Sequence, residues 1–328
     1  MLLTELPETF YVLSGTRAGV YAGPFYLAEK CMGLKPPLSY TDQIERLKKN
    51  GVEIPDYETA LSVLSEANYY RLSGYALQFR IAPQKSRYQS GTSFDKIHSL
   101  YLFDTELRNL LKPYLEKIEI LCRTRIAYGF SLNKCQSPPH DGHYEDRNFY
   151  NKTGHKKIIE SLHREENYNK YSLIVKHHRE KYENKMPLWV CVEIMSFSNL
   201  SKLYHAMYIS DKETIATSLS TRHDILSNHL HCLSNLRNKC AHGARLYNSV
   251  YNPPPKLGIA TLRKYPDLKS DSFLAYLIVI IRRLTQNDDK KALVDSFLNL
   301  IDKYHSYLDL DFLGCPVDYE MILRGEIN

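Results

Sequence analysis

Long apolar runs are missing from this sequence of 328 residues, and tryptophan occurs once. The longest apolar stretch, residues 273–281, is well short of the ~18–20 residues that a membrane-spanning helix needs, and we expect it to form a buried helix. The first thirty residues lack a basic start followed by an apolar block, so we expect no secretory signal. The seven cysteines are odd in number and irregularly spaced, which predicts reduced thiols rather than a disulfide framework. Together these absences favour a cytoplasmic protein that does not bind a membrane.

Several catalytic motifs are missing as well. No glycine-rich loop followed by Lys-Ser or Lys-Thr is present, so nucleotide hydrolysis is not expected. No Ser-His-Asp arrangement can be recognised. The nearest approach to a metal-binding motif is Cys135 with His140 and His143, but it lacks a second pair of cysteines. We therefore predict no metal and no cofactor.

Helical spacing of apolar residues dominates what is present, and strand-like alternation is hardly seen. The sequence therefore predicts an all-α fold. We expect a poorly ordered leader at 1–35, an N-terminal helical region at 36–93, a helical domain at 94–320 and a tail at 321–328.

Four features of individual helices can be predicted. Thr41 is expected to cap a helix over 42–49, and Asp56 or Tyr57 to open the next. The longest helical pattern runs from about Phe94 to Leu132, and Pro113 should kink or divide it. A further helix is expected to begin at Pro187-Leu188-Trp189 and to continue to about residue 204.

The stretch 236–248 places an arginine, an amide and a histidine within six residues, near the end of a predicted amphipathic helix that Gly243 should stop. His242 is expected in the last turn. At about 100° per residue, Asn238 and His242 share a face, whereas Arg237 points about 140° away from His242. Arg237 can therefore approach His242 only through its long side chain, a bend at the helix end or a second copy of the helix.

A basic segment at about 147–185 carries ten Lys or Arg residues against five Asp or Glu, with tyrosines in between, although the net charge of the whole chain is only +6. Such a segment can follow a phosphate backbone and stack bases; the alternative is a solvated helical face of mixed charge. Glu119 and Arg123 have the spacing of an ion pair, which either lines a cleft or is structural. The candidate RNA-binding residues are Lys156, Lys157, Arg164, Lys170, Arg179, Lys181, Arg123 and Arg245.

Eight short stretches, spread over about residues 36–320, together resemble Abi-like proteins of the AbiD/AbiF group, which are bacterial abortive-infection proteins that exclude phage. The most recognisable stretch is Asn68-Tyr69-Tyr70-Arg71-Leu72-Ser73-Gly74-Tyr75. The others, in chain order, are Pro36-Pro37-Leu38-Ser39-Tyr40, Phe103-Asp104 with Leu107-Arg108, Ile118-Glu119 with Arg123-Thr124, Pro187-Leu188-Trp189 with Glu193, Leu236-Arg237-Asn238 with Ala241-His242, Arg245-Leu246-Tyr247-Asn248, and Gly314-Cys315-Pro316. The Arg-Asn-x-x-x-His pattern also resembles the motif of HEPN-domain ribonucleases.

The resemblance implies a HEPN-like helical bundle and a metal-independent endoribonuclease in anti-phage defence, of a toxin-like kind that is restrained until infection. It implies Arg237 and His242 as catalytic residues, with Asn238 between them. RNA is the implied substrate, and a small noncoding RNA accompanies some members. Because HEPN sites combine residues from two domains and this chain has one such motif, a homodimer is expected. The competing hypothesis is a non-catalytic RNA-binding protein that forms a ribonucleoprotein; a protein-interaction or nucleotide-modifying module is a third.

Overall fold

The structure is a computed structural model, and it describes residues 36–81, 86–183 and 185–327. These residues form fourteen α-helices and short 3₁₀ turns, and their only β pairings are isolated bridges. The prediction of an all-α fold is confirmed. The predicted leader at 1–35 lies outside the described residues. No helix in the described ranges is both long enough and apolar enough to cross a membrane.

The chain divides into two compact units, residues 1–101 and 102–328, which are described separately. The boundary falls two turns inside the helix that begins at Phe94, whereas the sequence placed the start of the second domain at residue 94. The predicted domain limits stay predictions.

The first unit contains α1 (Tyr40–Lys49), α2 (Tyr57–Glu66), α3 (Tyr69–Ala76) and the 3₁₀ turn η1 (Leu77–Phe79). Ser39, not Thr41, caps α1: its backbone is extended and its Oγ accepts the N–H of Asp42 at 3.1 Å, so the helix begins two residues earlier than expected. Of the two residues expected to open α2, Asp56 is the N-cap and Tyr57 is the first helical residue. Asn68 caps α3 by accepting the N–H of Tyr70 at 2.7 Å.

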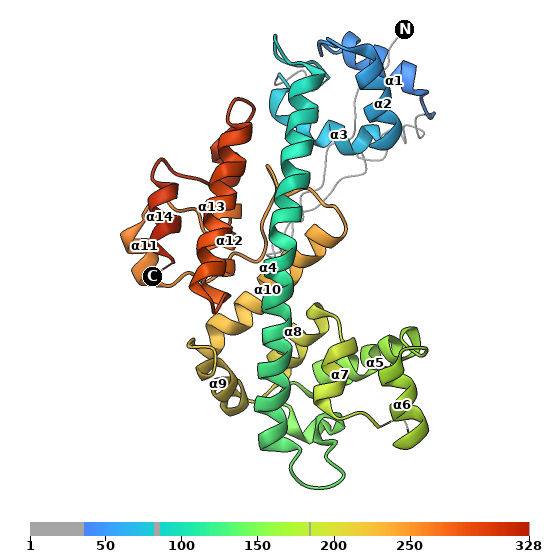
Figure 1. Ribbon diagram of the computed structural model, residues 1–328, viewed down its shortest axis with the longest axis vertical. Helices are drawn as coiled ribbons and strands as arrows, with labels where there is room; N and C mark the ends of the chain where they lie inside the picture. Colours follow the sequence, from blue (N-terminus) through green and yellow to red (C-terminus); the bar gives the residue numbers. More distant parts are fainter. Residues whose placement is uncertain (1–35, 82–85, 184, 328) are drawn as a thin grey trace, which may run out of the picture. The chain divides into compact units, whose positions relative to one another are not determined.

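The second unit holds most of α4 (Phe94–Lys134) and all later helices (Figure 1). In order these are α5 (Lys152–Tyr168), α6 (Leu173–Lys181), α7 (Leu188–Ile194), α8 (Phe197–Ala206), α9 (Ile209–Thr217), α10 (His223–Ala241), α11 (Ile259–Lys264), α12 (Phe273–Arg283), α13 (Asn287–Tyr304) and α14 (Tyr319–Gly325). The 3₁₀ turns are η2 (Gly142–Tyr144), η3 (Asp146–Asn148) and η4 (Leu310–Leu313). Helix α10 packs against α8, α9 and α12, while α5 packs against α7 and α8.

The structure decides two expectations about helix continuity: of the kink or division expected at Pro113, the division is absent, and the single helix expected from Pro187 is wrong. Helix α4 is not divided at Pro113: it continues through the proline, and the flanking Leu111 and Leu115 are buried, so core packing offsets the one lost backbone hydrogen bond. The helix expected over 187–204 is instead two helices, α7 and α8. They are separated at Ser196, whose backbone is extended and whose Oγ accepts the N–H of Asn199 at 3.3 Å as the cap of α8.

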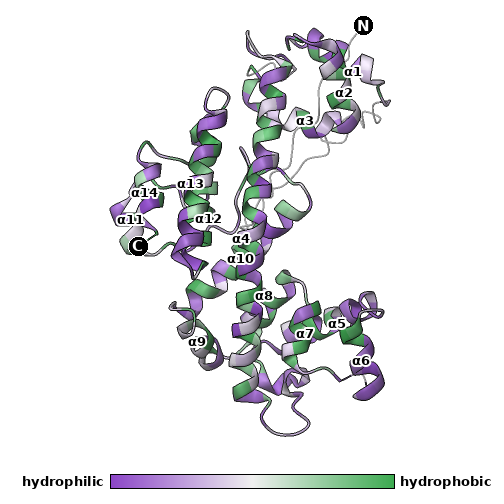
Figure 2. Cartoon of the chain, viewed as in Figure 1, coloured by the Kyte–Doolittle hydropathy of each residue, from purple (hydrophilic) through white to green (hydrophobic). Residues whose placement is uncertain are grey.

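Helix α12 lies in the core of the second unit: every residue from Phe273 to Ile281 is buried, as the sequence predicted. The other helices are amphipathic, and their hydrophobic and hydrophilic residues follow one another in bands (Figure 2). Along α10, the stripe of leucines that ends at Cys240 is buried. This packing fixes the end of α10, where Arg237, Asn238 and His242 lie.

Candidate functional site

The end of α10 is a Schellman-type stop. The helix ends at Ala241, His242 is the C-cap, and Gly243 takes a left-handed conformation with φ +64°. The N–H of Ala244 donates to the carbonyl of Lys239 at 2.8 Å, which satisfies a carbonyl of the last turn. Gly243 therefore stops the helix as predicted. His242 lies one residue beyond the last helical position.

Arg237 is anchored to α4. Its Nε donates to Oε2 of Glu119 at 3.2 Å, and its Nη1 lies 3.5 Å from Oδ1 of Asn238. The Glu119 side chain is 7% exposed and that of Arg237 is 41% exposed, so the ion pair reaches from the protein interior to the surface. Glu119 thus fixes the Arg237 guanidinium through Nε. Nη2 of Arg237 has no hydrogen bond within the described residues.

The other oxygen of Glu119 is held by Arg123, whose Nη2 donates to Oε1 at 2.5 Å. Arg123 also donates to the carbonyls of Glu193 and Met195, each at 3.0 Å, at the C-terminal end of α7. Helix C-termini carry unsatisfied carbonyls and partial negative charge, so an arginine is well placed there. Glu119 therefore lies between two arginines and joins α4, α7 and α10. Sequence spacing predicted the pairing with Arg123, but not that with Arg237.

Asn238 and His242 differ sharply in how they are held. Nδ2 of Asn238 donates to Oγ of Ser198 on α8 at 3.0 Å. His242 is exposed, and its backbone N–H bonds to the carbonyl of Asn238 at 3.0 Å, but its imidazole makes no hydrogen bond within the described residues. No hydrogen bond joins the side chains of Arg237 and His242, both of which are described residues. One copy therefore presents a fixed arginine and an unconstrained imidazole.

The segment after the helix is held by Asp104 of α4, which is fully buried. Its carboxylate accepts the backbone N–H groups of Leu246, at 3.0 and 3.1 Å, and of Tyr247, at 2.7 Å. Arg108 pairs with the same carboxylate and donates to the carbonyl of Ala244 at 3.3 Å. The Phe103-Asp104 and Leu107-Arg108 stretches thus fix the chain immediately after the candidate site. Arg245 lies inside this held segment and is half-buried.

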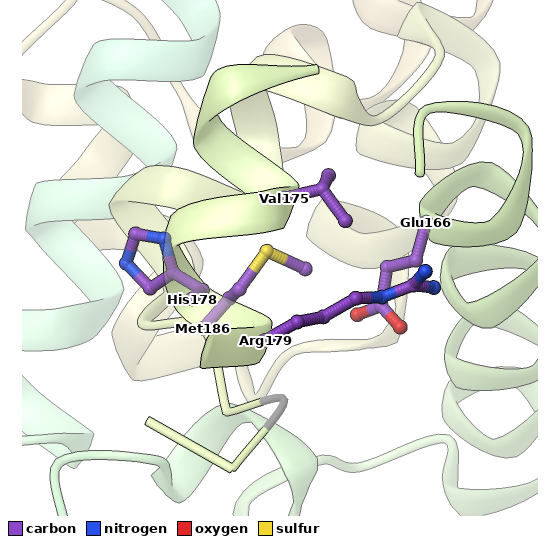
Figure 3. Close-up of a pocket in the computed structure, with 5 residues that line it drawn as sticks. All are labelled: Glu166, Val175, His178, Arg179 and Met186. Atoms are coloured by element: carbon purple, nitrogen blue, oxygen red, sulfur yellow. The ribbon is translucent and has the colours of Figure 1, made fainter. Parts of the chain in front are cut away.

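Most of the other candidate RNA-binding residues lie on α5, α6 and the turn between them, and five are exposed: Lys156, Lys157, Arg164, Lys170 and Lys181. Arg179 is different, because its Nη2 donates to Oδ1 of Asn167 at 3.0 Å. Figure 3 shows it extended toward Glu166 beside a small pocket that Val175, His178 and Met186 also line. None of these six cations hydrogen-bonds to Arg237, Asn238 or His242.

Among the described residues, no group of three or more His, Cys, Asp or Glu side chains is placed to hold a metal ion. His143 is buried beside Cys191, with Nε2 3.6 Å from Sγ, and burial lowers the pKa of His143 to about 4. The six cysteines in the described ranges are all free and buried.

The family model described as Abi-like protein matches residues 62–248, more than half of the chain. The chain belongs to the Abi-like protein family. The match includes the stretch from Asn68 to Tyr75 and that from Arg237 to Asn248, but not residues 36–61 or Gly314-Cys315-Pro316. No curated protein matches the chain. No solved structure matches it either. Membership of the family suggests a role in abortive-infection defence against phage.

Proposed function

We propose that this Abi-like protein is a metal-independent endoribonuclease of phage defence, with its site at the end of α10. The observation that carries the proposal is the arrangement of Arg237 and His242. The Arg237 guanidinium is fixed through Nε by Glu119, and the exposed imidazole of His242 has no structural hydrogen bond in the described residues. An anchored planar cation suits a phosphate, and an imidazole suits proton transfer near neutral pH.

In this reaction the RNA 2′-oxygen attacks the adjacent phosphorus, the bond from phosphorus to the 5′-oxygen breaks, and a cyclic phosphate and a 5′-hydroxyl are formed. His242 takes the proton of the 2′-hydroxyl or gives one to the departing 5′-oxygen. Arg237 stabilises the added charge on the phosphorane oxygens. Asn238, bonded to Ser198 and near Arg237, supports the guanidinium from its other side.

A complete site needs both a base and an acid, and one motif supplies one imidazole. A second copy of the chain would bring the second His242, which supports a homodimer as part of this proposal. Helix α4 offers a surface for it, since Ile120, Tyr128 and Leu132 are more than half exposed at steps of eight and four residues. Trp189, 39% exposed, stacks on Tyr128 with ring centroids 6.5 Å apart and extends the surface onto α7.

The test compares wild-type protein, His242→Ala and His231→Ala on labelled single-stranded RNA in EDTA. His231 is an exposed histidine on the same helix, so His231→Ala is a matched control. Loss of general acid–base catalysis should slow cleavage by about 10²–10⁴-fold in His242→Ala only. Equal cutting by all three proteins would refute the role of His242.

The non-catalytic ribonucleoprotein, with a small noncoding RNA as its partner, is the second candidate. It is favoured by the exposed cations of α5, of which Lys156 and Lys157 are adjacent. If it is correct, none of the three proteins cuts RNA although all bind it, and Lys156→Glu with Lys157→Glu impairs phage defence more than His242→Ala does.

A further inference from the structure

The turn between α5 and α6 exposes three large side chains within six residues. Tyr168 is 89% exposed, Tyr171 85% and Leu173 84%. We call these three residues the turn platform. Its two phenol rings are amphipathic and largely open to solvent, and Nζ of Lys170 lies over the Tyr171 ring.

The turn that carries the platform is itself well built. Ser172 caps α6, with its Oγ accepting the N–H of Val175 at 3.4 Å, and its own N–H donates to the carbonyl of Asn169 at 2.8 Å. Leu162 of α5 and Val175 of α6, on the two helices that the turn joins, are buried. The rings therefore project from an ordered support, so little conformational entropy is lost when a ligand stacks on them.

The charge around the platform is positive. Between residues 167 and 182 the chain has four Lys or Arg residues and a single acid, Glu180, which lies 3.8 Å from Lys176. Arg179 is half-buried and hydrogen-bonded to Asn167, and its side chain lies along a small pocket beside Glu166 (Figure 3). Lys170 and Lys181 remain exposed, and Nζ of Lys170 lies 4.9 Å from the centroid of the Tyr171 ring. Exposed rings beside exposed lysines complement a ligand that has both flat bases and phosphates.

We propose that the turn platform binds unpaired bases of single-stranded RNA, with Tyr168 and Tyr171 stacking on bases and Lys170 and Lys181 contacting phosphates. Duplex RNA does not fit, because its bases are already stacked on one another and their faces are closed to side chains. An apolar protein partner would leave the lysines without counter-charges. The inference rests on the proposed function only in taking RNA as the ligand, and does not require that RNA be cut.

The platform is connected to the candidate site through the first turn of α8. Glu165, three residues before Tyr168, accepts the N–H of Ser196 and an N–H of the Asn199 side chain, each at 2.9 Å. Ser198, between those two residues, accepts from Asn238. The first turn of α8 therefore contacts both the end of α5, which leads into the platform, and Asn238 of the candidate site.

The experiment uses the full-length His242→Ala chain in EDTA, so that RNA is not consumed, and measures fluorescence anisotropy with a labelled mixed-sequence RNA, single-stranded or annealed to its complement. Tyr168→Ala with Tyr171→Ala should weaken single-strand binding about 100-fold, roughly ten-fold for each lost stack, and leave duplex binding unchanged. The matching Phe variants should retain the affinity of the His242→Ala parent because they keep both rings. Lys170→Ala with Lys181→Ala should reduce the slope of log affinity against log salt by about 1.4.

The control is Tyr40→Ala with Tyr307→Ala, two exposed tyrosines elsewhere in the chain, which should leave binding unchanged. Unchanged single-strand affinity in the Tyr168/Tyr171 alanine variant, an equal loss on duplex RNA, or no RNA binding by the parent chain would overturn the inference. So would conversion of a dimer to a monomer by that variant in sedimentation, which would make the platform a contact between copies. Ring-dependent binding together with wild-type protein that fails to cut would overturn the proposed nuclease and leave this inference standing.

Discussion

Replacing Glu119 by glutamine tests the network that fixes Arg237. Glutamine keeps the shape of the side chain but removes the charge that two arginines share. At an effective dielectric constant of about 20, opposite charges about 3–4 Å apart attract by roughly 4–5.5 kcal/mol before desolvation is counted. The two pairs differ in exposure, however: the Arg123 side chain is 17% exposed and that of Arg237 is 41% exposed.

Solvent screening therefore makes the two ion pairs of Glu119 contribute unequally to the free energy of unfolding. We expect the pair with Arg123 to contribute about 3 kcal/mol, as a nearly buried ion pair does when one partner is removed, and the pair with Arg237 only about 0.5–1 kcal/mol. Glu119→Gln should accordingly lower the free energy of unfolding by about 3–4 kcal/mol. Urea denaturation of double-mutant cycles with Arg123→Gln and Arg237→Gln measures each coupling separately.

The rate of RNA cleavage distinguishes a positioning role of Glu119 from a purely structural one. Loosening the guanidinium should slow single-turnover cleavage by about ten-fold, which corresponds to about 1.4 kcal/mol of transition-state stabilisation. In an Arg237→Gln background, Glu119→Gln should slow cleavage no further, because the group that it positions is gone. Glu116→Gln, at an exposed glutamate one turn earlier on α4, is the control. A stronger coupling to Arg237 than to Arg123, or additive effects on cleavage, would refute the reasoning.

Three further predictions concern the support of the site and the core. Asp104→Asn should lower the free energy of unfolding by about 3–5 kcal/mol in urea denaturation, since a buried arginine loses its counter-charge; a loss below 1 kcal/mol would contradict it. Gly314→Ala should destabilise the folded protein by about 3 kcal/mol and Gly91→Ala by about 1 kcal/mol. Both glycines have positive φ, but of the two only Gly314 would place its new Cβ against another side chain, 2.2 Å from the Cβ of Ser272. Equal shifts in Tm would show that the clash is relieved. Burial lowers the pKa of both His143 and His229 to about 4, so between pH 4 and 6.5 the folded state binds fewer protons than the unfolded state. The contribution of these two histidines to stability should therefore be full above pH 6.5, fall between pH 6.5 and 4, and level off below pH 4. Urea midpoints across that range should fall less steeply in His229→Gln, and an unchanged slope would count against the burial argument.

Local periodicity predicted the helical elements well because it depends on neighbours in sequence. The buried stripe of α10, the stop at Gly243 and the buried helix after Ser272 all follow from spacing within a few turns. The errors arose where two local signals compete. Ser39 and Thr41 are both possible caps, and only the backbone conformation decides between them. At Ser196, apolar spacing continues across the break, while the side chain makes a cap and the backbone N–H bonds to Glu165.

The site itself was only half predictable. The order of residues from Arg237 to His242 placed an arginine, an amide and a histidine at one helix end, but it could not supply partners that lie far away in the chain. Glu119 is 118 positions from Arg237, and Ser198 is 40 positions from Asn238. Similarly, the charge surplus of the basic segment could not show that Arg179 is half-buried and bonded to Asn167 while Lys181 stays exposed. Those outcomes depend on how separate helices pack.

The same helix end produces both the order of Arg237 and the freedom of His242. Arg237 and Asn238 lie in the last helical turns, within reach of α4 and α8, and each is bonded to one of them. His242 falls one residue past the helix, where the chain turns at Gly243, so its imidazole leaves the packed surface. In the proposed nuclease, the anion-binding half of the site is therefore prearranged within one chain, whereas the proton-transfer half is oriented only when RNA or a second copy contacts His242. On this proposal, a single chain presents the anion-binding group in fixed position and leaves the orientation of the proton-transfer group to its partners.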